Sequence, residues 1–194
     1  MKRFSSGCAL ALAVTLAGCS ARDAGREAAP ADSAARASRT DTSAHADRGG
    51  ASGAPVLPVS GPGVTALAAR PGARLTLVNV WATWCAPCRE EFPALLKVAR
   101  AHRREGVRLV LVSADFPDQL PGVRAFLAAH GVTDTSYIKS GDDMPFINSI
   151  NPKWSGALPA TLLYDDRGRL VTFWEGMADE DRFERAVTRG LAQP

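Results

Sequence analysis

The feature that most constrains the fold of this sequence is a pair of cysteines placed where an apolar run meets a helical pattern. The apolar run predicts a buried strand over residues 75–82, and Cys85 and Cys88 follow it, just ahead of a helix expected over residues 90–104. Peptide dipoles and free N–H groups at a helix start stabilise an anion, so the first thiol should ionise more readily than a free cysteine. Because the thiolate is the attacking species, this placement indicates thiol–disulfide exchange.

The other two cysteines lie in the N-terminal segment. Lys2 and Arg3 precede an apolar stretch over residues 9–17, which looks like a bacterial signal peptide and is too short for a permanent membrane span. Cys8 lies in this segment, and the apolar stretch ends in Leu-Ala-Gly-Cys19, which resembles the lipobox of bacterial lipoproteins. That resemblance implies a signal peptide over residues 1–18 and a lipid on Cys19. An ordinary secretory peptide that happens to contain a cysteine is the alternative.

Export would place the mature protein in an oxidising compartment, with Cys85 and Cys88 as its free thiols. Residues 19–57 are rich in Ala, Ser, Asp, Arg and Gly and lack aromatic residues, so they cannot bury enough apolar surface to order themselves. We expect a flexible tether there and one domain over residues 58–194. The formal net charge of +3 and the lack of a basic patch argue against nucleic acid as a partner.

The domain alternates between strand and helix patterns. Such alternation predicts an α/β sheet covered on both faces. Residues 165–168 read Asp-Asp-Arg-Gly between two apolar runs, which is a hairpin signal. We expect strands over residues 75–82, 107–114, 135–138, 160–164 and 170–174, and helices over residues 90–104, 121–130, 144–150 and 179–191.

Three segments carry a resemblance to a known family. They read Val-Asn-Val-Trp-Ala-Thr-Trp-Cys-Ala-Pro-Cys-Arg-Glu-Glu-Phe-Pro over residues 78–93, Leu-Pro-Ala-Thr-Leu over residues 158–162, and Trp-Glu-Gly over residues 174–176. Together they resemble the TlpA/ResA-like family of membrane-tethered thiol–disulfide oxidoreductases. The resemblance covers residues 64–191 and implies a thioredoxin fold: a mixed central sheet, helices on both faces, and an αβ insertion before the strand that follows a cis-proline.

The resemblance implies roles for the residues around the cysteine pair. Cys85 would attack a substrate disulfide, and Cys88, one helical turn later, would resolve the mixed disulfide. Pro159 matches the family's cis-proline, whose preceding backbone at Leu158 pairs with a substrate strand. An ordinary trans proline before an edge strand is the alternative. The residues expected to contact substrate are Trp84, Ala86, Pro87, Leu158 and Pro159.

Glu91 lies three residues after Cys88 and so on nearly the same helical face. In the ResA-like branch the matching glutamate tunes the acid–base behaviour of the cysteines. If Glu91 is partly buried, burial would raise its pKa and let it exchange a proton with the resolving thiol. The alternative is a solvated acid in the first helical turn, like Glu90. General thioredoxins carry a buried aspartate where this chain has Asn79, so any proton shuttle here must use Glu91 or water.

The leading interpretation is a lipid-anchored oxidoreductase of the bacterial cell envelope that reduces protein disulfides, with cytochrome c maturation as a narrower version. We expect a monomer with no cofactor and no metal, a protein thiol or disulfide as substrate, and a membrane thiol transporter as electron donor. Ser20 after the lipidated cysteine favours sorting to the outer membrane, whereas such a transporter would serve a protein at the inner membrane. The sequence therefore leaves both membranes as alternatives for the anchor. The periplasm or another extracytoplasmic space would hold the domain.

Several alternatives remain beside this interpretation. The pair could serve a disulfide oxidant or isomerase, because Ala86 and Pro87 do not fix its potential. A structural disulfide would close too small a loop to stabilise much, and a zinc site lacks a second ligand pair. Copper chaperones of this fold use a wider cysteine spacing, and peroxidases place a threonine three residues before their cysteine, whereas Thr83 is two before Cys85. A non-catalytic binding domain is the last alternative.

Overall fold

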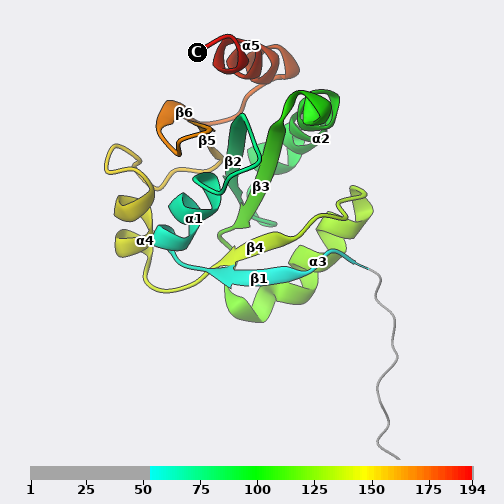
Figure 1. Ribbon diagram of the computed structural model, residues 1–194. Helices are drawn as coiled ribbons and strands as arrows, with labels where there is room; N and C mark the ends of the chain where they lie inside the picture. Colours follow the sequence, from blue (N-terminus) through cyan, green and yellow to red (C-terminus); the bar gives the residue numbers. More distant parts are fainter. Residues whose placement is uncertain (1–52, 194) are drawn as a thin grey trace, which may run out of the picture. The chain divides into compact units, whose positions relative to one another are not determined.

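The computed structural model describes residues 53–193, and the expected signal peptide, Cys19 and most of the tether lie outside them. A six-stranded sheet forms the centre of the domain (Figure 1). The first four strands in spatial order pair in parallel, whereas the fifth pairs antiparallel with both of its neighbours, so the sheet is mixed. In spatial order the strands are β1 (Val56–Val59), β4 (Ser136–Lys139), β3 (Val107–Ser113), β2 (Leu75–Trp81), β5 (Ala160–Asp165) and β6 (Leu170–Glu175).

Helices cover both faces of this sheet. They are α1 (Gly61–Ala68), α2 (Ala86–Ala101), α3 (Leu120–Ala129), α4 (Asp143–Ile150) and α5 (Glu180–Leu191). One apolar core joins α2, α3 and α5 to the sheet through side chains such as Phe92, Leu127 and Phe183. A second core joins α1 and α4 to the other face through Val64 and Phe146. The predicted thioredoxin fold, with helices on both faces of a mixed sheet, is confirmed.

Strand β2 is buried along its whole length, because it pairs with β3 on one side and β5 on the other while helices cover both faces. This explains why its sequence is an apolar run with no alternation. The parallel strands β2 and β3 end at the same edge of the sheet, at Trp81 and Ser113. The antiparallel strand β5 begins at that edge, with Ala160 opposite Val80. Three chain segments therefore meet beyond this edge, and one of them carries the cysteines.

The segment between β3 and the cis-proline contains α3, β4 and α4, which is one helix and one strand more than a single connecting helix, as the expected αβ insertion requires. Its strand β4 lies between β1 and β3 and thereby widens the sheet. The hairpin expected at residues 165–168 joins β5 and β6. There Gly168 adopts a positive φ of 73°, a backbone conformation that side-chain-bearing residues rarely adopt. The carboxylate of Asp165 accepts hydrogen bonds from the backbone N–H groups of Arg167 and Arg169, which fixes the turn.

The sequence patterns do not predict β1 and α1. The expected boundary between tether and domain, residues 57 and 58, falls inside β1, whose Val56 pairs with Ser136 of β4; the fold therefore starts earlier than predicted. Helix α1 follows at once, and the Ser60 hydroxyl caps it by accepting a hydrogen bond from the Gly63 N–H at 3.3 Å. Both elements escape a pattern search because β1 is four residues long and contains Pro58, while α1 opens on Gly-Pro-Gly.

Helix α2 also begins earlier than predicted, at Ala86 instead of residue 90, and it ends at Ala101. Residues Arg103–Glu105 form a separate short 3-10 helix, closed by Gly106 with a positive φ of 94°. The early start matters because it makes Cys85 the residue that caps the helix. Among residues 53–193, no helix combines the length and the apolar composition that crossing a bilayer requires.

Candidate functional site: the disulfide at the start of helix α2

Cys85 and Cys88 form a disulfide, with their Cα atoms 5.3 Å apart. Cys85 is the N-cap residue of α2: its backbone is extended, and its Sγ accepts a hydrogen bond from the Cys88 N–H at 3.3 Å. The exposed fraction is 6% for Cys85 and 0% for Cys88, so Cys85 is the more accessible sulfur, as the sequence predicts. A sulfur in the cap position receives the free N–H groups of the first turn, and these groups stabilise a thiolate there.

The expected cis-proline is present at the same edge of the sheet. The peptide bond between Leu158 and Pro159 is cis, and Pro159 immediately precedes Ala160, which pairs with Val80 near the end of β2. Pro159 is buried, and its carbonyl accepts a hydrogen bond from the Gly176 N–H at 2.8 Å. Leu158 is half-buried and packs against the core cluster that contains both cysteines. The backbone before Pro159 therefore lies at the edge of the sheet where β2 ends and the segment with the cysteines begins.

Glu91 is buried, with 2% of its surface exposed, whereas the neighbouring Glu90 is exposed. The structure thus has the buried arrangement and not the solvated one. One carboxylate oxygen accepts a hydrogen bond from Asn79 Nδ2 at 2.9 Å, and the other accepts one from the Ala178 N–H at 2.8 Å. Asn79 also donates to Thr161 Oγ1 at 3.1 Å, so the carboxylate is tied to β2, to β5 and to the loop before α5.

Burial raises the pKa of Glu91 to about 7, because an apolar surrounding disfavours the charged carboxylate. The two hydrogen bonds, from Ala178 and Asn79, and the charge of Arg182 act in the opposite direction and only partly offset this effect. A carboxyl group with a pKa near neutrality can both release and accept a proton under ordinary conditions. It lies one helical turn after Cys88, which is itself fully buried.

A second buried carboxylate was not found by sequence reasoning. Asp115 has 0% exposure and follows β3 by two residues. It accepts hydrogen bonds from the Thr83 N–H at 2.9 Å, from the Ser113 hydroxyl at 2.6 Å and from the Thr83 hydroxyl. These bonds fix the loop between β2 and Cys85 to the end of β3. The sequence contains a signal for this role. Asp115 comes just after β3, and the loop with Thr83 comes just after the parallel strand β2, so both lie at the same edge of the sheet.

Three large apolar side chains are exposed next to residues that belong to, or are bonded to, the segment with the cysteines. Trp84 precedes Cys85, Phe116 follows the anchoring Asp115, and Met177 precedes Ala178, which is bonded to Glu91. Their exposed fractions are 59%, 61% and 51%, respectively. Ala86 and Pro87, for which the resemblance predicts contact with substrate, are exposed between the two cysteines. Exposed apolar side chains gathered around a reactive group are typical of a surface that contacts another protein.

Trp81 is buried and Trp84 is exposed, although the two are close in sequence. The Trp81 ring packs in tilted arrangements against those of Phe92 and Phe126, at centroid distances of 5.1 and 4.8 Å. This aromatic cluster supports the underside of α2 near the disulfide. Within residues 53–193, His, Cys, Asp and Glu side chains form no group of three that could hold a metal ion. The role expected of Cys19 concerns a residue outside this range.

Comparison with known proteins agrees with this geometry. Thiol:disulfide interchange protein HelX of Rhodobacter capsulatus is 35% identical over 121 residues, which cover 61% of this chain and 62% of the relative. Thiol-disulfide oxidoreductase ResA of Halalkalibacterium halodurans is 28% identical over 107 residues, covering 55% of this chain and 57% of the relative. The matched regions thus span less than two thirds of these relatives' lengths.

Solved structures show the same fold. The crystal structure of a thiol:disulfide interchange protein of the thioredoxin family from Chlorobium tepidum covers 72% of this chain and 97% of its own, with a TM-score of 0.55 and 23% sequence identity. A model of the family described as Redoxin matches residues 30–184, which include both cysteines, Glu91 and Pro159. That match extends over most of the sequence, and the chain therefore belongs to the Redoxin family.

Proposed function

We propose that the protein is a thiol–disulfide oxidoreductase that reduces disulfides in other proteins. The observation that carries this proposal is the disulfide at the N-cap of α2, with the more accessible sulfur on Cys85 and a buried carboxyl group one turn beyond Cys88. The names of the relatives HelX and ResA support it. The surface around the pair, with Trp84, Phe116 and Met177 exposed, suits a protein substrate better than a small molecule.

The reaction begins with the reduced pair. The Cys85 thiolate attacks one sulfur of a substrate disulfide, forms a mixed disulfide and releases the first substrate thiol. Cys88 then loses its proton and attacks the Cys85 sulfur, which closes the disulfide seen in the structure and releases the second substrate thiol. Two electrons pass from the protein dithiol to the substrate, and a thiol donor must return the pair to its reduced form.

Glu91 would accept the proton of Cys88 during the second step. Cys88 is fully buried, so water reaches it poorly, and an internal base near its position would make up for that. The pKa of Glu91, about 7, lies between that of an ordinary carboxyl group and that of an ordinary thiol. Asn79 would orient the carboxylate through its hydrogen bond of 2.9 Å and would carry no proton itself.

The first test is the reduction potential of the Cys85–Cys88 pair in the full chain. A value near about −270 mV is expected of an electron donor, whereas a value near about −120 mV would point to an oxidant that donates its disulfide. Trapping gives the second test: Cys88→Ser should accumulate a mixed disulfide with a disulfide-bonded protein substrate. The matched variant Cys85→Ser should trap none, and trapping by both or by neither would contradict the assignment of nucleophile.

The cell-envelope location is part of this proposal. The resemblance of residues 16–19 to a lipobox supports a lipid on Cys19, and a membrane thiol transporter would then supply electrons. Metabolic labelling of the full chain with a radioactive fatty acid in a bacterial host tests the anchor. Cys19→Ser should abolish the label, whereas Cys8→Ser, a second cysteine in the same segment, should keep it. Equal labelling of the wild type, Cys19→Ser and Cys8→Ser would contradict lipidation at Cys19.

Cytochrome c maturation is the narrower proposal. Haem attachment sites have the pattern Cys-x-x-Cys-His, and their cysteines must be reduced before haem is attached. The reduced protein should therefore reduce the disulfide of such a peptide faster than that of a peptide of the same composition in scrambled order. Equal rates would leave a general protein-disulfide reductase as the function.

A further inference from the structure

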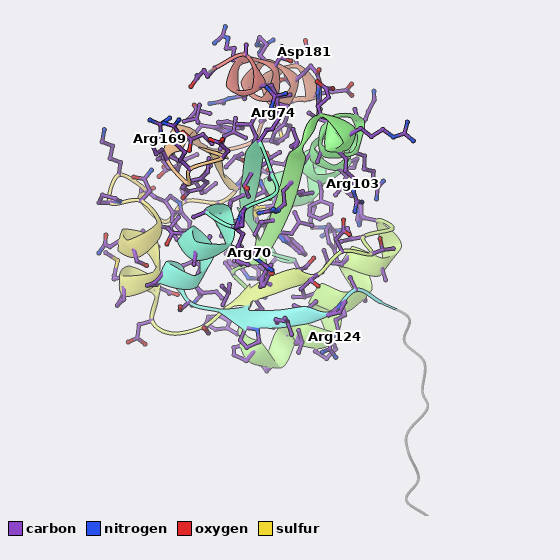
Figure 2. All side chains as sticks on the ribbon, viewed as in Figure 1. Arg70, Arg74, Arg103, Arg124, Arg169 and Asp181 are labelled. Carbon is purple, nitrogen blue, oxygen red and sulfur yellow. A yellow bond between two sulfur atoms is a disulfide. The ribbon has the colours of Figure 1, made fainter. Side chains whose placement is uncertain are left out.

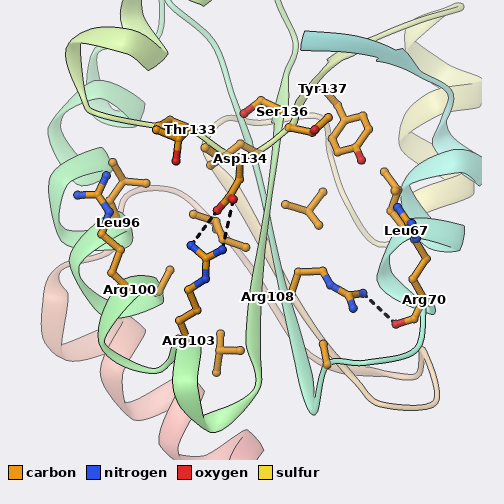
Figure 3. A pocket seen from close by; sticks show the side chains of 18 of the residues that line it. Leu67, Arg70, Leu96, Arg100, Arg103, Arg108, Thr133, Asp134, Ser136 and Tyr137 are labelled. Carbon is orange, nitrogen blue, oxygen red and sulfur yellow. Dashed lines mark hydrogen bonds and ion pairs between the residues drawn. The ribbon is translucent and has the colours of Figure 1, made fainter. Parts of the chain in front are cut away.

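A cavity of about 430 Å³ lies at the opposite edge of the sheet from the disulfide, between β3 and β4 (Figure 3). It exists because the two strands pair only through Val112 and Ser113 with Tyr137 and Ile138. Residues 107–111 of β3 therefore have no partner in β4, and the sheet opens there. Its volume falls in the range of small-molecule binding sites. Leu96, the first residue of α2 that lines the cavity, follows Cys88 by eight residues, so about 12 Å of helix separates the cavity wall from the nearer cysteine.

Arginine side chains dominate the charge of the cavity wall. Arg70, Arg100, Arg103 and Arg108 line it, against one acidic residue, Asp134 (Figure 3). Arginines are spread over much of the molecule, as Figure 2 shows, but here four of them border one cavity. The excess of positive charge would attract an anion and would be only partly screened inside a cavity.

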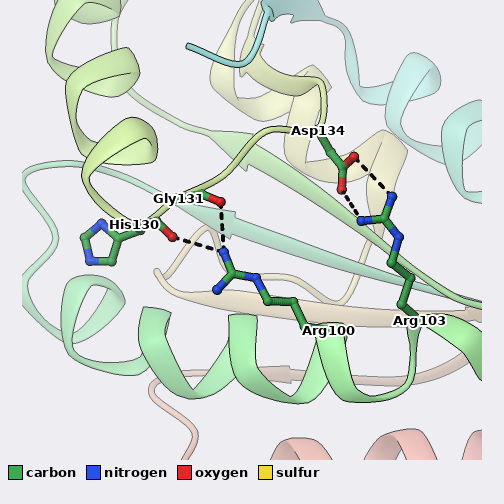
Figure 4. Close-up of polar contacts among 5 residues, drawn as sticks. All are labelled: Arg100, Arg103, His130, Gly131 and Asp134. Carbon is green, nitrogen blue, oxygen red and sulfur yellow. Dashed lines mark hydrogen bonds and ion pairs between the residues drawn. The ribbon is translucent and has the colours of Figure 1, made fainter. Parts of the chain in front are cut away.

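Only one of these arginines has a carboxylate partner among residues 53–193. Arg103 contacts both oxygens of Asp134, at 3.3 and 3.4 Å (Figure 4). Arg100 donates instead to the backbone carbonyls of His130 and Gly131, at 3.1 and 2.9 Å (Figure 4). These two carbonyls end α3, so the guanidinium is held in place without being neutralised.

The other two arginines lie beside α1. Arg108 donates to the backbone carbonyls of Arg70 and Pro71, both at 2.8 Å, and so also lacks a compensating charge. The guanidinium of Arg70 has no hydrogen bond or ion pair within residues 53–193 and is exposed. A guanidinium has five N–H donors in a planar fork, so Arg108 retains donors for a ligand oxygen.

A buried hydroxyl provides an independent sign of a ligand. Ser136 lines the cavity, has an exposed fraction of 1%, and its Oγ finds no hydrogen-bond partner within the described residues. Leaving a buried hydroxyl unpaired is unfavourable, and such groups usually have a partner. A polar atom of a bound molecule would supply the missing hydrogen bond.

The positive groups stand on two sides of the open sheet. Figure 3 shows Arg100 and Arg103 on the side of α2, and Arg70 and Arg108 on the side of α1. Apolar residues of β3 line the wall between them, including Leu109 and Leu111. A molecule that filled this space would meet cations at both ends and apolar surface in the middle.

We propose that the cavity between β3 and β4 binds a small organic anion that carries anionic groups at two ends. Arg108 and Arg70 hold one end, Arg100 holds the other, and the Ser136 hydroxyl bonds a polar atom between them. The site is separate from the disulfide and does not depend on the redox function. Carboxylate and phosphate groups both suit guanidinium forks, so the shared chemistry is the pair of anionic oxygens.

Calorimetric titration of the full chain tests the proposal, with citrate and inorganic pyrophosphate as probes at low ionic strength. Saturable binding of at least one probe is expected, and it should weaken as salt is added. A preference for citrate would identify a carboxylate ligand, and a preference for pyrophosphate a phosphate ligand. If neither probe binds saturably at millimolar concentrations, the proposal is wrong.

Arg70→Gln is the decisive variant, because its side chain has no bond to the described part of the protein and its loss should leave the fold intact. It should weaken binding at least about tenfold, since a hydrogen bond between charged groups is lost. Arg124→Gln is the matched control: Arg124 is an exposed arginine of α3 that does not line the cavity (Figure 2). Unchanged affinity in Arg70→Gln, or an equal loss in Arg124→Gln, would overturn the proposal.

Discussion

The two ends of helix α2 carry different chemistry. Its N-cap and first two turns hold the disulfide and the buried Glu91, and exposed apolar side chains lie on neighbouring loops. Its last turn and the residues after it hold Arg100, His102 and Arg103, which face an open cavity or the neighbouring α5. Each end suits the helix dipole, because anions are favoured at the start and cations at the end. The same electrostatic rule thus supports a reactive thiolate at one end and a group of cations at the other.

The difference also shows two ways of building a site. At the first end the groups themselves are close in sequence, since Cys85, Cys88 and Glu91 lie within residues 85–91, although the hydrogen-bond partners of Glu91 come from β2 and from the loop before α5. The second end depends on distant segments, because α2, β3, β4 and the loop after α1 each supply part of the cavity wall. A single substitution should therefore change the reaction rate strongly at the first end. At the second end it should have a smaller effect, because several segments form the cavity wall together.

The largest effect is expected on activity, and it separates the ends most sharply. Cys85→Ser should reduce the rate of protein-disulfide reduction to that of the uncatalysed reaction, because the attacking sulfur is gone. Arg104→Gln changes an exposed residue just beyond α2 and should leave the rate within about twofold of the wild type. Insulin reduction followed by turbidity measures both. A comparable loss in Arg104→Gln would mean that the two ends of the helix are not independent.

Glu91 should make folding stability depend on pH. Its pKa is raised from 4.5 to about 7, so between these values the folded protein holds a proton that the unfolded chain releases. Stability therefore falls as pH rises through this window, by about 3 kcal/mol in all. Glu91→Gln has no such proton, and its stability relative to the wild type should improve by about that amount between pH 4 and pH 8.

Urea unfolding of the oxidised proteins across this pH range measures the effect. The exposed neighbour supplies the control, since Glu90→Gln should follow the wild-type curve. If the free energy of unfolding changes with pH in the same way for Glu91→Gln and the wild type, the carboxyl group is not buried in solution as it is in the structure.

Asp115 should matter for stability at the first end, although it lies outside α2. Asp115→Ala leaves the Thr83 and Ser113 groups without their acceptor and should cost about 2 kcal/mol. Asp118→Ala, an exposed change in the 3-10 helix Pro117–Gln119 close by, should cost less than about 0.5 kcal/mol. Urea unfolding of the wild type and both variants at one pH measures these losses. Equal losses would show that the three bonds of Asp115 do not stabilise the loop.

The smallest effect is expected at the second end. His102 Nε2 lies 2.7 Å from Glu184 and Nδ1 lies 2.9 Å from Glu105. Partial burial lowers the pKa of His102, but the hydrogen bonds to and charges of these two acids outweigh it and raise the pKa above its ordinary value. The folded protein thus keeps a proton that the unfolded chain loses, and this stabilisation is lost as pH rises through the folded pKa.

His102→Gln should therefore lower the melting temperature at pH 6 more than at pH 9, by an amount that corresponds to less than about 1 kcal/mol. Thermal unfolding at the two pH values, with the oxidised protein, measures it. A larger loss at pH 9 than at pH 6 would reverse the sign and contradict the ion pairs with Glu184 and Glu105.

Sequence reasoning located the first end well. Cys85 and Cys88 could be placed at a helix start because the apolar run of β2 and the helical pattern flank them directly. The burial of Glu91 could not be decided, since Glu90 and Glu91 lie in the same turn and the partner that encloses Glu91 is Ala178, 87 residues away. Asp115 was missed because its partners come from a different loop.

The second end could not be predicted from the sequence. The cavity depends on where β4 pairs with β3, and that register is set by the packing of a four-residue strand between two neighbours. Strand β1, which holds β4 from the other side, also has too short a pattern to detect. Local patterns therefore describe elements and the motifs at their ends, whereas spaces between elements require the tertiary structure.

The bond between Glu91 and the backbone of Ala178 makes one amide a natural reporter. The Ala178 N–H donates to the carboxylate at 2.8 Å, so the resonance of this proton should shift downfield when Glu91 becomes charged. An NMR titration of that single signal in the isotope-labelled protein would report the charge of Glu91 without a mutation. Comparing the oxidised and reduced protein in this way would reveal whether electrons and protons move together.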